Sequence, residues 1–163
     1  MAAVTEASRA NKASRAAAAR RPALAVVAVL LLAVAAAGCM PADANKMLIY
    51  TNQSRAYVGV RPLQEHPTLT AKAESWARHM AAEGRLSHST LSAGLSTLNW
   101  NSLGENVGYS SPTSNTLWTI HVMFVQSAGH RANLLNPKYT HMGVGVHKDS
   151  QGRVWVAEVF AQL

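Results

Sequence analysis

Seven histidines are the residues of this 163-residue chain best suited to chemistry. They stand at positions 66, 79, 88, 121, 130, 141 and 147. Imidazole can transfer protons near neutral pH or bind a divalent cation. The chain has no HExxH motif, and its single cysteine excludes a Cys/His cluster, so spacing alone defines no metal motif. Chemistry here depends on which imidazoles the fold brings together.

Three short segments carry the strongest candidates: LSHS at 86–89, GENV at 104–107 and SAGHRAN at 127–133. If His88, His130 and Glu105 converge on a cleft, they can hold a divalent cation such as Zn²⁺ and leave positions open for water or ligand. Alternatively, Glu105 only hydrogen-bonds one imidazole and fixes its tautomer. Ser127 offers either a nucleophile near His130 or a cap for the short helix that contains it.

Helical patterns precede and separate these segments. Asp43 or Asn45 can cap a helix that runs to about Val58, with Gly59 as its stop. Residues 67–83 have apolar side chains at helical spacing and end at Gly84. A third helix is predicted over 114–126; Leu117, Ile120, His121 and Phe124 share one side of it.

Strand patterns dominate the C-terminal part. Residues 142–146 and 154–160 are β-rich runs separated by a turn segment with Gly152, which predicts a hairpin. The second run is almost continuously apolar, so we expect it to be covered on both faces. Residues 85–112 read as loop with a short strand at 105–109. Together the elements predict one α+β domain with a small, mostly antiparallel sheet.

The N-terminal 38 residues have the pattern of an export signal. Five basic side chains and one acidic one in residues 1–21 precede an uncharged apolar run of 15 residues, 23–37. That run is shorter than the roughly 20 residues of a membrane-spanning helix, and such a pattern is typical of a cleaved leader. The run ends in AAGC, which resembles the lipobox of bacterial lipoproteins, with Ala36 where Leu is commoner. We therefore expect lipidation of Cys39; the alternative is an ordinary secretory signal with Cys39 incidental.

The predicted organisation is a leader over 1–38, a lipidated tether over 39–45 and a folded domain over 46–163. The leader carries five of the 15 Lys and Arg residues and one of the eight acidic residues, so the remainder has a net charge of about +3. Residues 40–163 contain no Lys/Arg run, so the sequence does not favour nucleic-acid binding. We expect an exported protein on the extracytoplasmic side of the cell membrane, held there through Cys39.

The three site segments, in this order, strongly resemble the CAP superfamily, also called the SCP-like or TAPS domain. The resemblance extends through NQSR at 52–55, the helix pattern from Leu69 to Met80, and MGVGV at 142–146. It implies a three-layer α-β-α sandwich with a cavity lined by two histidines and, in many members, two acidic residues. It assigns His88 and His130 as the histidine pair and Glu105 as the first acid. Ser127 stands where the second carboxylate belongs.

Two classes of function follow from this resemblance. The first is a binding module for a small apolar or lipid-like ligand, or for a cell-envelope protein. The second is a hydrolase that uses His88, Glu105 and His130 with a metal ion, or Ser127 as a nucleophile. Ser127 and His130 stand three residues apart, which is not a known triad spacing, so the metal-dependent version is the better enzymatic one. The resemblance favours the binding module, because many members of the family have no demonstrated catalysis.

Overall fold

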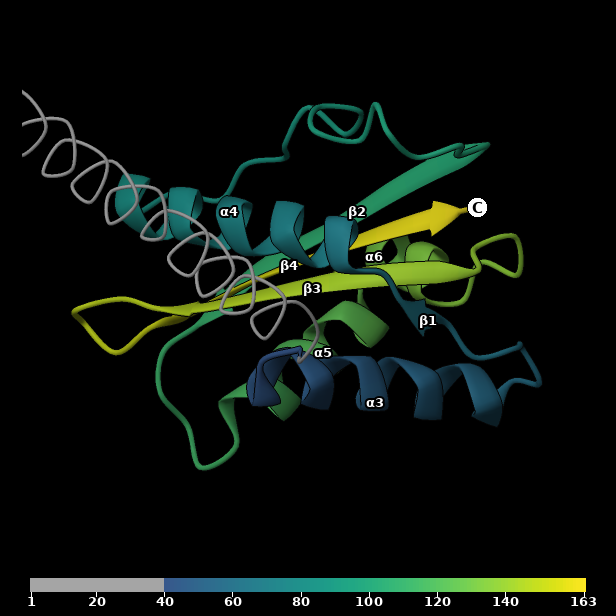
Figure 1. Ribbon diagram of the computed structural model, residues 1–163. Helices are drawn as coiled ribbons and strands as arrows, with labels where there is room; N and C mark the ends of the chain where they lie inside the picture. The colour runs from purple at the N-terminus through teal and green to yellow at the C-terminus, as the bar shows by residue number, and fades with distance from the viewer. Residues whose placement is uncertain (1–39) are drawn as a thin grey trace, which may run out of the picture. The chain divides into compact units, whose positions relative to one another are not determined.

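The computed structural model describes residues 40–163, and Figure 1 shows how their helices and strands are arranged. The predicted leader and Cys39 lie outside the described residues. Within the described part, no helix is long and apolar enough to cross a membrane.

A four-stranded mixed sheet forms the centre of the domain. Its strands are β1 (Gln64–Glu65), β2 (Ser102–Ser110), β3 (His141–Lys148) and β4 (Val154–Gln162), in the order β1-β3-β4-β2. The β3–β4 hairpin turns at Gly152, whose φ is 78°. β2 pairs antiparallel with β4, and β1 pairs parallel with β3. Strand β4 is buried on both faces, as its continuous apolar pattern predicted.

Helix α4 (Pro67–Glu83) covers one face of the sheet. It packs so closely on β3 that a Cβ built on Gly143 would lie 2.0 Å from the backbone of Leu69, and one on Gly145 would lie 2.1 Å from that of Ala73. The predicted bounds of this helix are confirmed. Its C-terminal Gly84 has a φ of 62°, the left-handed conformation that ends many helices.

Helices α3 (Ala42–Tyr57), α5 (Thr116–Gln126) and α6 (Ala128–Leu134) lie on the opposite face. The sheet therefore separates two apolar cores. One contains Met47, Ile120 and Phe124, and the other contains Leu69, Met80 and Trp155. This is the predicted α-β-α sandwich.

Three local predictions need correction. Helix α3 begins at Ala42, inside the segment predicted as a tether, and Ala44 is buried in the core. Its N-cap residue is Pro41, and neither Asp43 nor Asn45 is a cap. Strand β2 is longer than predicted because its whole length pairs with β4. Strand β1 was not predicted: two residues carry no periodicity, and only pairing with β3 defines them.

Candidate functional site

The three predicted site residues come from different elements that meet beside β2. Glu105 lies in β2, His130 in α6, and His88 in the segment between α4 and β2. His88 Nδ1 lies 2.8 Å from Glu105 Oε1, and the backbone N–H of Ser89 donates to the same oxygen at 2.9 Å. The Glu105 side chain is only 1% exposed, whereas that of His88 is 64% exposed. The carboxylate is thus a buried anchor, and the His88 imidazole extends outward.

This geometry favours the prediction that Glu105 hydrogen-bonds one imidazole and fixes its tautomer, rather than the prediction that it binds a cation directly. A carboxylate at Nδ1 holds the ring hydrogen there and leaves Nε2 of His88 open, as in carboxylate–histidine pairs that support metal ligands. The other oxygen of Glu105, Oε2, is buried and has no hydrogen-bond partner within residues 40–163.

His130 is placed differently. Its ring packs against Phe124 with centroids 4.9 Å apart, and its Nδ1 is buried without a hydrogen-bond partner among the described residues. Burial lowers the pKa of His130 below its usual value, and the nearby His88 lowers it further. His130 is therefore mostly a neutral imidazole at pH 7.

A cleft of about 290 Å³ opens beside His130. Its lining is largely apolar and consists of Leu86, Val107, Gly108, Tyr109, Met123, Phe124, Ser127 and His130. Because Gly108 has no side chain, the ring of Phe124 can pack directly against the backbone of β2. A Cβ at position 108 would lie 2.7 Å from Phe124 Cε1. This volume is near the lower end for ligand pockets, so the cleft suits a small molecule or one end of a longer one.

Ser127 lines this cleft. It is the N-cap residue of α6, yet its side chain makes no capping hydrogen bond. No hydrogen bond joins Ser127 to His130 in the described part of the chain, and Glu105 is bonded to His88 instead. The arrangement therefore lacks both contacts that a Ser127–His130–Glu105 triad requires.

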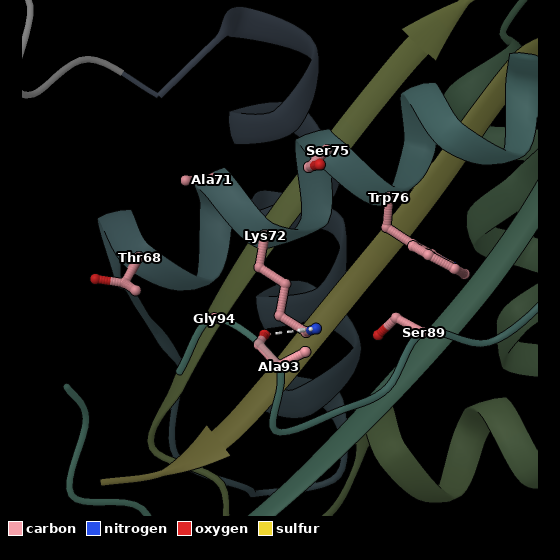
Figure 2. Close-up of a pocket in the computed structure, with 8 residues that line it drawn as sticks. All are labelled: Thr68, Ala71, Lys72, Ser75, Trp76, Ser89, Ala93 and Gly94. Carbon is pink, nitrogen blue, oxygen red and sulfur yellow. Dashed lines mark hydrogen bonds between the residues drawn. The ribbon is translucent and has the colours of Figure 1, made fainter. Parts of the chain in front are cut away.

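Helix α4 also contacts the segment that contains His88. Residues of the helix and of this segment line a second cavity of about 490 Å³ (Figure 2). Lys72 Nζ donates to Thr90 O at 2.9 Å and to Ala93 O at 3.0 Å, and Trp76 Nε1 donates to Ser87 O at 2.8 Å. These bonds fix the backbone on both sides of His88. Burial lowers the pKa of Lys72, and the charge of Glu105 partly opposes that change.

A buried polar network that the sequence did not indicate lies behind the site. Glu158 in β4 is fully buried; Asn106 Nδ2 donates to its Oε2 at 3.1 Å and Thr51 Oγ1 to its Oε1 at 3.4 Å. Asn106 also donates to the carbonyl of His130, and Asn133 donates to the carbonyl of Glu105. Burial raises the pKa of Glu158 to about 8 although both hydrogen bonds act in the opposite direction. Glu158 is therefore mostly a neutral acid at pH 7.

The other histidines lie outside the cleft beside His130, and His66 and His141 pack edge to face with ring centroids 5.9 Å apart. His66 accepts a hydrogen bond from the backbone N–H of Thr68 and caps α4, while His79 stacks on Trp76. His121 is buried beside Ser54, and His141 lies next to Thr140. Over residues 40–163, no three His, Cys, Asp or Glu side chains are grouped so that they could hold a metal ion. The groups at the site that could bind a metal ion are thus the imidazoles of His88 and His130, because Glu105 is hydrogen-bonded to His88.

Comparison with known proteins agrees with this architecture. The model of the cysteine-rich secretory protein family, CAP, matches residues 48–160. The chain belongs to the CAP family. A curated relative, the uncharacterized protein YkwD of Bacillus subtilis, is 27% identical over 121 residues, which are 70% of this chain and 45% of YkwD. The chain thus spans less than half of that relative.

Solved CAP structures share the fold. An extracellular protein with an SCP domain from Bacillus anthracis superposes with a TM-score of 0.61 at 22% identity, covering 74% of this chain and 40% of that one. An outer surface protein from Borrelia burgdorferi gives 0.63 at 14% identity, covering 74% and 92%. NaASP2, solved with Zn²⁺, gives 0.55 at 16% identity, covering 76% and 83%. At these identities the three structures show that the chain shares their fold.

Proposed function

We propose that this protein is an exported, lipid-anchored CAP domain that binds a small apolar or lipid-like ligand in the cleft beside His130. The observation that carries the proposal is the combination of largely apolar walls with a buried, unpartnered His130 Nδ1 among the described residues. An apolar pocket with few convergent polar groups is the usual form of a small-molecule site. A cell-envelope protein that inserts an apolar side chain is the alternative occupant.

The residues have distinct roles in this proposal. Phe124, Met123 and Leu86 remove the apolar part of the ligand from water, which contributes about 25 cal/mol per Å² buried. His130 is neutral and can hydrogen-bond a hydroxyl or carboxyl group at the polar end of the ligand. Glu105 does not contact the ligand; it positions His88 at the edge of the site.

The open imidazole nitrogens favour a second candidate, the binding of an exchangeable divalent cation by His88 and His130. The buried Glu105 behind His88 fits this use, but two nitrogens form an open, weak site rather than a closed structural one. A bound Zn²⁺ supplies Lewis acidity. The Zn²⁺ in the NaASP2 structure makes the same cation a reasonable choice for this chain.

The binding proposal can be tested with 11-dansylaminoundecanoic acid, a fluorescent fatty acid. Leu86 is 41% exposed and lines the cleft, so Leu86→Glu should place a charge among the apolar walls and weaken binding at least tenfold. The matched control is Ile49→Glu, because Ile49 is 46% exposed and is not a lining residue of the cleft. Equal affinities of wild type and Leu86→Glu would contradict the proposal.

A further inference from the structure

A third cavity, of about 380 Å³, lies between α3, α5 and α6 and shares no lining residue with the cleft beside His130. Its walls are mainly apolar and aromatic. The lining consists of Tyr50, Gln53, Ser54, Tyr57, Val58, Trp118, Val125, Arg131 and Leu135. Tyr57 is 92% exposed and Trp118 46% exposed, so this groove is open to solvent at its rim.

Ser54, a lining residue of the groove, is hydrogen-bonded to His121, which is not itself a lining residue. Ser54 Oγ in α3 lies 2.9 Å from His121 Nε2 in α5, although the two residues are 67 positions apart in the sequence. His121 is only 1% exposed, and the rings of Tyr50 and Trp118 pack on it with centroids 5.7 and 5.6 Å away. A serine at hydrogen-bond distance from an imidazole nitrogen is the arrangement that activates a hydroxyl for attack on an acyl group.

The surroundings keep this imidazole unprotonated. Burial lowers the pKa of His121 to about 4. Its Nδ1 is buried and has no hydrogen-bond partner within the described residues. In the tautomer that carries the hydrogen on Nδ1, Nε2 accepts the hydroxyl hydrogen of Ser54. A carboxylate at Nδ1 is what makes such a base efficient. Without one, and because burial disfavours the imidazolium that forms when His121 accepts a proton, we expect slow turnover.

We propose that Ser54 is a nucleophile that accepts acyl groups from esters with an apolar acyl chain, with His121 as its base. Ser54 Oγ bonds to the ester carbonyl carbon while its proton passes to His121 Nε2. The bond from that carbon to the alkoxy oxygen then breaks, and the proton leaves with the alcohol. Water, deprotonated by the same nitrogen, attacks the acyl-serine, which releases the carboxylic acid and regenerates the hydroxyl.

The groove provides the other contacts that this reaction needs. Its apolar walls suit the acyl chain, and Gln53 and Arg131 are lining residues that can donate hydrogen bonds to a carbonyl oxygen. Arg131 is held in place by its Nη1, which donates to Val125 O at 2.8 Å. This inference is independent of ligand binding beside His130.

The test is covalent labelling of the full-length protein with an alkyl fluorophosphonate, followed by intact mass measurement and peptide mapping. We expect one adduct per molecule, on the peptide that contains Ser54. The adduct should be absent from Ser54→Ala and present in Ser150→Ala, the control, because Ser150 is an exposed serine in the β3–β4 turn. An adduct that persists in Ser54→Ala, or no adduct at all, would overturn the proposal.

The role of His121 is tested by His121→Phe, which keeps an aromatic ring against Tyr50 and Trp118 but removes both nitrogens. We expect its labelling rate to fall at least tenfold. If this variant does not fold, wild type decides: Ser54 should react at least 100-fold faster in the folded protein than in 8 M urea. Similar rates in the two states would mean that the pair is only a structural hydrogen bond.

Discussion

Glu105 and Glu158 are two buried carboxyl groups of one sheet whose hydrogen-bond donors differ. Glu105 accepts hydrogen bonds from His88 and from the backbone of Ser89, so it has donors that suit a charged carboxylate. Glu158 is also buried, but its partners are the neutral side chains of Asn106 and Thr51, and its pKa rises to about 8. Glu105 therefore contributes to the proposed cation site by positioning His88, and Glu158 contributes to the pH dependence of stability.

Glu158 should make stability fall as pH rises. Between pH 4.5, its ordinary pKa, and about 8, the unfolded chain has lost a proton that the folded chain keeps. Raising pH through this window therefore favours unfolding. Glu158→Gln removes the effect, so we expect its stability relative to wild type to increase from pH 4.5 to 8.5, by on the order of 4 kcal/mol. Urea unfolding at both pH values measures this; a constant difference would contradict it.

Zn²⁺ should raise the melting temperature of wild type, because an ion that binds only the folded protein stabilises it by about 2.7 kcal/mol at 100 times its Kd. The rise should be absent in His88→Ala/His130→Ala. The control is His79→Ala/His147→Ala, which removes two histidines that do not line the cleft. Differential scanning fluorimetry measures the shifts, and equal shifts in both double variants would disprove the cation site.

At the scale of elements, the contact between α4 and β3 positions much of the site. Gly143 and Gly145 let the backbone of the helix lie directly on the strand. The helix in turn holds the His88 segment through Lys72 and Trp76 (Figure 2). A displacement of α4 would thus move His88 away from Glu105.

Gly143→Ala and Gly145→Ala should each destabilise the domain by about 3 kcal/mol, because the added Cβ overlaps the backbone of α4. Gly129→Ala is the control: nothing lies within 4 Å of a Cβ at that position, which is inside helix α6. We expect that variant to be as stable as wild type or slightly more so. Chemical denaturation compares the three, and unchanged stability in both β3 variants would refute the close packing.

At the scale of the whole molecule, the described residues form one α-β-α domain that starts directly after Cys39. Two apolar cores enclose the sheet, and Arg55, which is fully buried, joins the segments around it. Its guanidinium donates to the carbonyls of Arg61, Leu134, Asn136 and Tyr139. A lipid on Cys39 would therefore hold a folded domain at the membrane through a connection of only two residues before α3.

Cys39→Ser tests the predicted anchor. Without the thiol no lipid can be attached, so we expect the variant in the medium and wild type in the membrane fraction. Immunoblots of the two fractions measure the distribution. Retention of Cys39→Ser in the membrane fraction would point instead to an uncleaved leader.

The sequence by itself determined the local features. Pro67 and Gly84 predicted both ends of α4, and the apolar runs predicted the β3–β4 hairpin, because caps, turns and periodicity act over a few residues. The site motifs also indicated the CAP fold and predicted His88, Glu105 and His130 as the site residues. The contact of Glu105 with His88 rather than His130 was left open by the sequence and decided by the tertiary structure.

Only the tertiary structure decided which distant residues became partners. The register of β2 on β4 places Asn106 opposite Glu158, and the packing of α3 against α5 brings Ser54 to His121. Neither pair has a sequence signal, because side chains on separate elements meet through the packing of entire helices and strands. The burial that shifts the pKa values of Glu158 and His121 arises from the same packing, so the sequence alone did not reveal it.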